Sequence, residues 1–391
     1  MEDMLDSILS EEDRYFREVV RAWVERECPK AWCRELERRE DVFPQDLWDK
    51  LVAFGALGIG IPEEFGGQGG SMLNQVIFAR ELARTAAGLT WVWGVTSFSG
   101  AKLLLYAGSP EQKQALLPKI ATGTLKTAMA FTEPGGGTDL LGGLRTRAER
   151  REGGWLLRGE KIWSTGASVA DYLVVLARTD DAVERRTQGI SLLLVPRDLP
   201  GIEIQPLPKI GMRAYSSCTV RFDDVYLGTD ALIGEEGKGW YQSLEMLNYE
   251  RLINAATCLG ILDGVIEDAL EYLRTRRAFG KPIGQFQILQ HYVADMAMWR
   301  AQAELLIFHA AKRQSEGKPI AMEAAMAKIA ASEYANRAAD LGIQILGGMG
   351  YSAETDMQRY WRDSRLLRIG PISNEMGKNL IAEQLGLPRS F

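Results

Sequence analysis

Residues 131–139, FTEPGGGTD, form a glycine-rich loop of the kind that can approach a phosphate. Glycines let backbone N–H groups come close to a ligand, Thr132 and Thr138 offer hydroxyls, and Pro134 stiffens the turn. In a dinucleotide fingerprint or a P-loop, such glycines follow a strand and open a helix. Residues 144–163 instead predict a strand and a hairpin, which excludes both motifs. The residues leave open a different ligand loop or a plain surface turn.

Histidine and cysteine chemistry is sparse. The chain has only 2 histidines, His291 and His309, and both lie in stretches that predict ordinary helix positions. A zinc site and a Ser–His–Asp triad are therefore not expected. The cysteines have no CxxC spacing, which favours a reducing compartment; they are Cys28, Cys33, Cys218 and Cys258.

The bulk composition is that of a globular protein. Of the 391 residues, 46% are hydrophobic, which is enough for two or three packed domains. The net charge is −6, whereas nucleic acids and anionic membranes require a basic surface. The acidic N-terminus lacks the basic and apolar regions of a secretory signal, and no apolar stretch has the length of a membrane span. We therefore expect a cytoplasmic protein with no nucleic-acid partner and no membrane span.

The elements that must position these residues are expected to form three domains. Residues 1–125 predict an N-terminal helical domain, with a helix start at Ser10 and a second capped helix over 108–123. Residues 126–236 change to short β-branched and aromatic runs between turns, which predict a central β-barrel or sandwich domain. Residues 237–391 return to long helical patterns typical of a C-terminal four-helix bundle, and two glycines near residue 260 can mark bends. The predicted fold class is α+β and multidomain.

Five stretches, in one order along the chain, resemble the acyl-CoA dehydrogenase family. They are AMAFTEPGGGTD (128–139), GEKIWSTGA (159–167), FDDVYL (222–227), RRAFGKPIGQFQ (276–287) and QILGGMGY (344–351). The resemblance covers essentially the whole chain. It implies the same α, β, α order of domains, bound FAD, and a homotetramer built as a dimer of dimers.

In this family the TEP loop and the WST stretch surround the isoalloxazine ring, so the resemblance implies a set of flavin contacts. These are Phe131, Thr132, Thr138, Trp163, Ser164 and Thr165. A flavin needs hydrogen bonds to its ring and an aromatic wall against solvent, and these side chains can supply both. Without the resemblance, Trp163 would be expected as a buried aromatic of the β domain.

Further positions match the family's contacts to the FAD pyrophosphate and adenine, which a partner subunit provides. They are Arg276, Phe279, Gln287, Gln344, Gly347 and Gly348, while Ser373 and Glu375 match other polar contacts to FAD. Arginine can bind a pyrophosphate through two hydrogen bonds at once. Ala278 stands where the family often has a hydroxyl, so one phosphate contact is expected to be missing.

The family removes an α-proton from an acyl thioester with one carboxylate, often in a C-terminal Y-E-G-T-like motif. Here Pro371 occupies that position in RIGPISNEM (368–376). In isovaleryl-CoA-type and long-chain-type members the glutamate lies on an earlier helix, and NYERL (248–252) implies Glu250. Its neighbours three and four positions away are mostly apolar, which would raise its pKa and make it a better base. The alternative is a helix-surface glutamate paired with Arg251.

Proline at 371 also lacks the backbone N–H that helps hold the thioester carbonyl in this family. Either Ile372 donates instead or the flavin alone activates the carbonyl, and Ile372 replaces a small glycine, so an unusual substrate is expected. The resemblance implies acyl-CoA contacts by Thr138, Tyr241, Asn248, Tyr249 and Arg251. Bulky residues at the pocket floor would favour short, branched or cyclic acyl groups, unless they are plain core; these are Trp91, Trp93 and Val95.

We therefore expect an FAD-dependent acyl-CoA dehydrogenase, without a metal, that passes electrons to electron-transferring flavoprotein. Three other activities on the same fold stay open: an enoyl-CoA reductase, an oxidase using O₂, and a dehydrogenase of carrier-protein thioesters. A non-enzymatic alternative is an inactive flavin-binding subunit of a hetero-oligomer. A Glu250 side chain that points away from the flavin would favour this last alternative.

Overall fold

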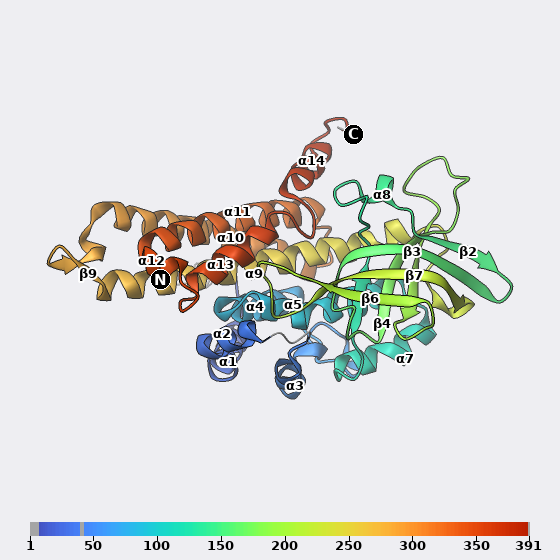
Figure 1. Ribbon diagram of the computed structural model, residues 1–391, viewed down its shortest axis with the longest axis horizontal. Coiled ribbons are helices and arrows are strands. Elements are labelled where there is room, and N and C mark those ends of the chain that lie inside the picture. The colour runs from blue at the N-terminus through green and yellow to red at the C-terminus, as the bar shows by residue number, and fades with distance from the viewer. Residues whose placement is uncertain (1–7, 40–42, 390–391) are drawn as a thin grey trace.

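The computed structural model describes residues 8–39 and 43–389, so the part of the signal-peptide expectation that concerns residues 1–7 lies outside the described residues. Where it is described, the chain passes from helices through one sheet and back to helices (Figure 1). This order confirms the predicted fold class. No helix among the described residues is both long enough and apolar enough to cross a membrane.

The N-terminal helices begin where the sequence predicts caps. Ser10 and Asp13 exchange side-chain-to-backbone hydrogen bonds, a capping box that starts α1 (Glu11–Glu27). Ser109 caps α7 (Pro110–Ala121) through the same arrangement. The other helices of this layer are α2 (Lys30–Arg38), α3 (Gln45–Phe54), α4 (Met72–Thr85), α5 (Gly88–Gly94) and α6 (Leu103–Ala107), with a π-helical segment at Val95–Lys102 between the last two.

The middle of the chain, where the sequence predicts a β domain, forms one mixed sheet. Its strands follow the order β6-β7-β3-β2-β4-β5-β8, and β1 pairs in parallel with β4. The long antiparallel strands β3 and β7 shift register between Lys161 and Ser164, near the end of β3. The strands are β1 (Thr127–Ala130), β2 (Arg147–Arg151), β3 (Gly154–Thr165), β4 (Tyr172–Arg178), β5 (Ile190–Pro196), β6 (Ile202–Leu207), β7 (Ser217–Gly228) and β8 (Leu232–Ile233).

The C-terminal helices pack side by side into a bundle that extends away from the sheet, as Figure 1 shows. A hairpin of two short strands, β9 and β10, closes the end of the bundle that is farthest from the sheet. The elements are α9 (Gly239–Thr275), β9 (Arg277–Ala278), β10 (Lys281–Pro282), α10 (Gln287–Ser315), α11 (Ala321–Leu346), α12 (Gly348–Tyr351), α13 (Met357–Leu367) and α14 (Asn374–Gln384). Both histidines lie in α10, as expected.

The glycines of α9 do not bend the helix, which corrects the prediction from sequence. Residues 239–275 form one uninterrupted helix of 37 residues. A Cβ atom at Gly260 would lie 2.2 Å from the carbonyl oxygen of Arg80, and one at Gly264 would lie 2.6 Å from that of Arg84. The glycines therefore let α9 pack closely against α4.

A buried network of charges fixes α9 in place. Arg80 of α4 donates to Asp263 of α9 at 2.7 Å and pairs with Glu304 of α10 at 3.0 Å. Arg300 of α10 donates to the same Asp263 at 2.6 Å. Each charge has an opposite partner, as buried charges require. The helix that carries Glu250 is thus tied to α4 and α10.

Candidate active site

The glycine-rich loop is locked onto β3 by a buried ion pair. Lys161 of β3 is fully buried, and its Nζ donates to Glu133 Oε1 at 2.8 Å and to the Phe131 carbonyl at 3.0 Å. Glu133 also accepts hydrogen bonds from the backbone N–H groups of Arg145 and Thr146 at 2.7 and 2.9 Å. Burial alone would raise the pKa of Glu133, but Lys161 and these donors hold it below its usual range.

The glycines of the loop serve two different purposes. A Cβ atom at Gly136 would lie 2.7 Å from Gly143 in α8 (Leu140–Gly143), so Gly136 permits close packing within the loop. Gly135 and Gly137 have nothing within 4 Å of a Cβ position and face open space, beside the exposed Thr138. The backbone on that side is accessible to a ligand.

Trp163 is held in an unusual conformation at the end of β3. Its φ is 61° and its side chain is 57% exposed, although it sits in a strand among buried residues. A bulky residue at positive φ is strained, and such strain gathers at functional sites. The side-chain oxygen of the buried Ser164 has no partner among the described residues, while Thr165 shares a 2.8 Å hydrogen bond with Ser217.

These features fit one side of a flavin ring. The open glycine backbone, the unpartnered Ser164 hydroxyl and the exposed Trp163 lie at the neighbouring ends of β1 and β3. Thr132 belongs to the same surface, because its carbonyl accepts a 2.8 Å hydrogen bond from Ile162 N. Phe131 is buried and lies in the adjoining apolar core. The geometry of this group is compatible with the flavin contacts that the sequence predicts, and these contacts stay a prediction.

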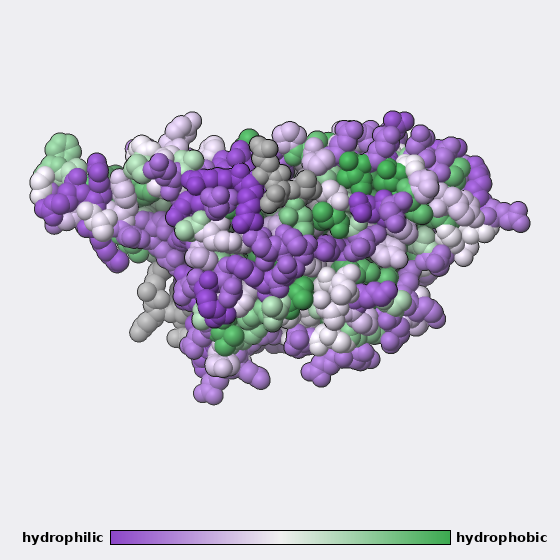
Figure 2. Space-filling view, turned by 60° about the horizontal axis from the view of Figure 1, so that its bottom comes forward, coloured by the Kyte–Doolittle hydropathy of each residue, from purple (hydrophilic) through white to green (hydrophobic). Residues whose placement is uncertain are grey.

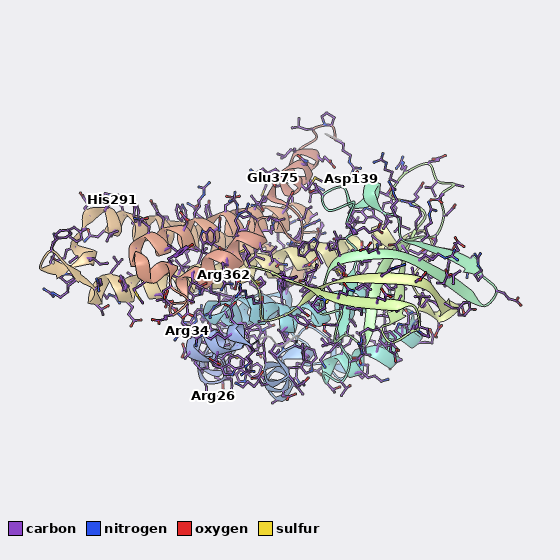
Figure 3. The ribbon with its side chains drawn as sticks, viewed as in Figure 1. Arg26, Arg34, Asp139, His291, Arg362 and Glu375 are labelled. Atoms are coloured by element: carbon purple, nitrogen blue, oxygen red, sulfur yellow. The ribbon has the colours of Figure 1, made fainter. Side chains whose placement is uncertain are left out.

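The expected pyrophosphate and adenine contacts lie at the opposite end of the molecule. Figure 1 places β9 and α12 at one end of the bundle and β3 and α8 at the other. This distal group, as we call it, comprises Arg276, Phe279, Gln287, Gln344, Gly347 and Gly348. All six are exposed, and Figure 3 shows His291 of α10 in the same distal region, far from Asp139. One chain therefore does not bring the two groups of expected cofactor contacts together.

The distal hairpin presents an apolar tip. Phe279 and Gly280 form a two-residue turn between Ala278 and Lys281, both at positive φ (51° and 80°). The Phe279 side chain is 93% exposed. Figure 2 shows hydrophobic colouring at this end, in addition to hydrophobic patches over the other half of the same face.

The Glu250 side chain on α9 faces the interior of the protein rather than solvent. It is 7% exposed, and its Oε2 atom has no hydrogen-bond partner among the described residues. Burial raises its pKa to about 7, against the opposing charges of Arg251 and Lys328. A carboxyl group with this pKa can take up a proton near neutral pH. The alternative of a surface glutamate is thereby excluded, although Arg251 does act on it electrostatically.

The segment between α13 and α14 approaches this carboxyl group through Lys328 of α11. Lys328 Nζ donates to the Ile372 carbonyl at 2.6 Å and to Asn374 Oδ1 at 2.9 Å. The Ile372 N–H has no acceptor within the described part of the chain, so it remains able to donate to a ligand. Ser373 accepts from Met376 N as the N-cap of α14, and Glu375 is exposed on the first turn of that helix (Figure 3).

The residues expected to contact acyl-CoA fall into two groups. Tyr241 is exposed and its hydroxyl lies 2.7 Å from the Thr187 hydroxyl. Asn248, Tyr249 and Arg251 are buried, and Arg251 donates to Asn248 Oδ1 at 2.5 Å. Tyr249 packs under the ammonium group of Lys102, whose Nζ lies 4.7 Å from the ring centroid.

The expectation that Trp93 forms a pocket floor is not supported. Its indole N–H donates to the Ala56 carbonyl at 2.9 Å, and its ring packs 5.0 Å from Phe78 within the helical core. Trp93 is thus the plain core residue that the sequence left open. Trp91 is half-buried beneath Lys209, and Val95 is buried.

Sequence reasoning missed Glu133, Lys161 and Lys328. All three are buried charges within functional surroundings. A lysine within the alanine-rich stretch AAMAKIAA (324–331) is a recognisable sign of a buried cation. The sequence around Lys161 gives no such sign of a buried cation. The alternation of side chains along its strand does not reveal which loop covers the residue. Among the described residues, no three histidine, cysteine, aspartate or glutamate side chains gather as metal ligands do.

Comparison with known proteins identifies the family of the chain. The models of the acyl-CoA dehydrogenase N-terminal, middle and C-terminal domains match residues 10–124, 128–225 and 237–386. A probable acyl-CoA dehydrogenase of Bacillus subtilis, YngJ, is 35% identical over 96% of this chain and 98% of its own. The mitochondrial isovaleryl-CoA dehydrogenase of Pongo abelii is 32% identical over 95% of this chain and 88% of its own.

A solved structure has the same fold from end to end. The acyl-CoA dehydrogenase of Geobacillus kaustophilus superimposes with a TM-score of 0.92 and 34% identity, covering 97% of this chain and 99% of its own. Three successive domain models, full-length relatives and this superposition agree on one family. The chain therefore belongs to the acyl-CoA dehydrogenase family, whose members are FAD-dependent oxidoreductases acting on CH–CH bonds.

Proposed function

We propose that this protein dehydrogenates a short, branched or cyclic acyl-CoA between its α and β carbons, with Glu250 as the base. The observation that carries the proposal is the buried Glu250 carboxyl group, which has a free oxygen and a pKa raised to about 7 by burial. Pro371 stands where other members carry their base, so Glu250 is the carboxylate left to fill that role.

The residues of this chain would have separate roles in the reaction. Glu250 Oε2 takes the α-proton, and the dry surroundings strengthen it as a proton acceptor. The unpaired Ile372 N–H is available to the thioester oxygen, which would make the α-proton more acidic. Arg251, held by Asn248, keeps a positive charge close to the carboxylate that must be ionised before reaction. Bound FAD would supply the acceptor for the β-hydrogen, which leaves as hydride.

FAD would be held by two copies of the chain. The Phe131–Thr138 loop and Trp163–Thr165 would enclose the ring, with polar contacts from Ser373 and Glu375. The distal group of a second copy would bind the pyrophosphate and adenine. The separation of the two groups within one chain supports this arrangement, and so does the exposed Phe279 tip (Figure 1). We therefore propose a dimer as the smallest complete unit, and a tetramer as a dimer of such dimers.

The proposed size of the acyl group is supported by fewer residues than the sequence indicated. With Trp93 in the helical core, Trp91 and Val95 are left to narrow the pocket. Ile372, in place of a small glycine, would add bulk to the segment that Lys328 holds. We retain the proposal of short, branched or cyclic acyl groups on these three residues.

For the electron acceptor we propose electron-transferring flavoprotein. The exposed edge of Trp163 supports a route by which electrons leave the flavin through this face. An oxidase would react with O₂ instead, an enoyl-CoA reductase would run in the opposite direction, and a carrier-protein enzyme would ignore free acyl-CoA.

Anaerobic mixing of the purified flavoprotein with straight, branched and alicyclic acyl-CoAs tests the proposal. Loss of the oxidised flavin absorbance with one short or branched acyl-CoA would support it. A yellow protein that no acyl-CoA bleaches would contradict it. Repeating the reaction with electron-transferring flavoprotein, with O₂ and with acyl-carrier protein would identify the acceptor and the thioester carrier.

A further inference from the structure

Lys328 of α11 is a buried cation whose charge acts on Glu250. Its side chain is 1% exposed, and both of its hydrogen bonds go to neutral oxygens, those of Ile372 and Asn374. No carboxylate forms an ion pair with it in the described part of the chain. Burying an ammonium group without a direct carboxylate partner is costly, so a buried lysine of this kind is expected to have a role beyond filling space.

The hydrogen bonds of Lys328 fix the segment that carries the free Ile372 N–H. Lys328 binds the Ile372 carbonyl on one side, and Asn374 is held in turn by Ser332 at 3.0 Å and by Glu333 at 2.9 Å. This polar row of α11 anchors the connection between α13 and α14. The position of the Ile372 peptide is therefore set by α11 rather than by the connection itself.

We propose that Lys328 is a positioning residue that holds the Ile372 peptide and, through its charge, keeps Glu250 ionised at neutral pH. The inference rests on the proposed function, in which Glu250 is the base. Among the described residues Lys328 donates to Ile372 and Asn374 and has no hydrogen bond or ion pair to Glu250, so it does not contact the proposed base directly.

 Its action is indirect, because it works through the Ile372 peptide and through its electric field at Glu250.

The electrostatic part of the inference has a definite sign. Burial raises the pKa of Glu250, while two cations oppose that shift: Arg251 on α9 and Lys328 on α11. Losing the Lys328 charge should therefore move the pKa of Glu250 further upward. Burial also lowers the pKa of Lys328 itself to about 8, so the side chain is protonated in the range where Glu250 titrates.

The other groups that face Lys328 do not reverse this sign. The Cys258 thiol of α9 has its pKa raised to about 12 by burial and stays neutral. Glu375 of α14 and Glu333 of α11 favour the charged ammonium, and Arg251 disfavours it. Two of the three charged neighbours therefore keep Lys328 protonated at neutral pH.

Three substitutions separate the two parts of the role. Lys328→Arg keeps the charge, Lys328→Gln keeps a donor for the Ile372 carbonyl but removes the charge, and Lys328→Met removes both. Ser332→Ala is the matched control, because it removes a buried hydrogen bond to Asn374 without changing any charge.

The pKa of Glu250 is read in the holoenzyme by infrared difference titration of its carboxyl band, which Glu250→Gln identifies by its loss. This readout needs no turnover, so failure of the proposed substrate is seen separately, as a wild-type flavin that no acyl-CoA reduces. The acidic limb of acyl-CoA-dependent flavin reduction is followed in parallel.

We expect Lys328→Gln to raise the midpoint of the Glu250 titration by about one pH unit. The ionised fraction of Glu250 at about pH 6.5 would then be roughly eightfold smaller. Lys328→Met should show the same shift with a further loss of rate, whereas Lys328→Arg and Ser332→Ala should titrate like the wild type. If Lys328→Met does not fold, Lys328→Gln alone carries the charge test. A titration in Lys328→Gln that matches the wild type would overturn the inference and leave Lys328 a structural residue.

Discussion

Replacing Lys161 by methionine should weaken the attachment of the 131–139 loop to the sheet. Methionine keeps most of the length of the side chain but has no donor for Glu133 Oε1 or for the Phe131 carbonyl. A carboxylate that is only 6% exposed would then lose its cation. The loop proposed to enclose the flavin would lose both hydrogen bonds from Lys161. It would keep the bond from Ile162 N to the Thr132 carbonyl and those from Arg145 and Thr146 to Glu133.

The expected cost follows from the burial of both partners. Breaking a buried ion pair by removing one member costs about 3–5 kcal/mol, because the other charge stays buried. The backbone N–H groups of Arg145 and Thr146 still bind Glu133, so we expect the lower end, about 3 kcal/mol at neutral pH.

The cost should depend on pH. In the wild type the pKa of Glu133 is held low, so this carboxyl contributes stability above its unfolded pKa and loses that contribution as pH falls. The variant lacks most of this contribution. The difference in unfolding free energy between wild type and variant should therefore shrink as the pH falls below about 4.5, the unfolded pKa of a glutamate, and through the lower folded pKa of Glu133.

Urea unfolding followed by tryptophan fluorescence at several pH values measures these differences. Lys161→Met combined with Glu133→Gln should recover part of the loss, because the buried charge is gone. Lys318→Met is the matched control: its pair with Glu316 is exposed and should contribute less than about 1 kcal/mol. A loss of under about 1 kcal/mol for Lys161→Met, with no dependence on pH, would refute the reasoning.

Three further predictions use other parts of the structure. The rate of flavin reduction by acyl-CoA should rise with pH through about 7, where burial places the pKa of Glu250, and a flat profile between about pH 5.5 and 8 would contradict this. Phe279→Ala should weaken FAD retention at least tenfold in equilibrium dialysis, as roughly expected for loss of one aromatic contact, without changing the melting temperature of the apoprotein, because the side chain is 93% exposed. Unchanged FAD affinity would remove the hairpin from the cofactor site. Gly260→Ala should lower stability by about 1–3 kcal/mol, since its Cβ would lie 2.2 Å from the Arg80 carbonyl, and an unchanged melting curve would contradict the close packing of α9 on α4.

Local signals in the sequence were sufficient for the helix starts and for the order of domains. Ser10 and Ser109 cap helices because their hydroxyls meet backbone N–H groups three residues ahead. The short β-branched and aromatic runs of residues 126–236 also predicted strands, since this pattern too can be read from neighbouring residues.

Contacts between distant elements could not be predicted in the same way. Gly260 appeared to be a bend because its packing partner, Arg80, lies far away in the sequence. Trp93 matched a pocket position, but its indole N–H finds the Ala56 carbonyl in the helical core. Lys161 and Lys328 look like ordinary charged residues until the elements that cover them are in place.

The central claim is that Glu250 removes the α-proton, and single-turnover reduction of Glu250→Gln tests it most directly. The variant would be mixed without oxygen with the acyl-CoA that bleaches the wild type fastest, beside Glu245→Gln, an exposed glutamate on the same helix. The account predicts that Glu250→Gln retains its flavin but reduces it about 10²–10⁴-fold more slowly, while Glu245→Gln keeps the wild-type rate. Reduction of Glu250→Gln at the wild-type rate would contradict the account and place the base elsewhere.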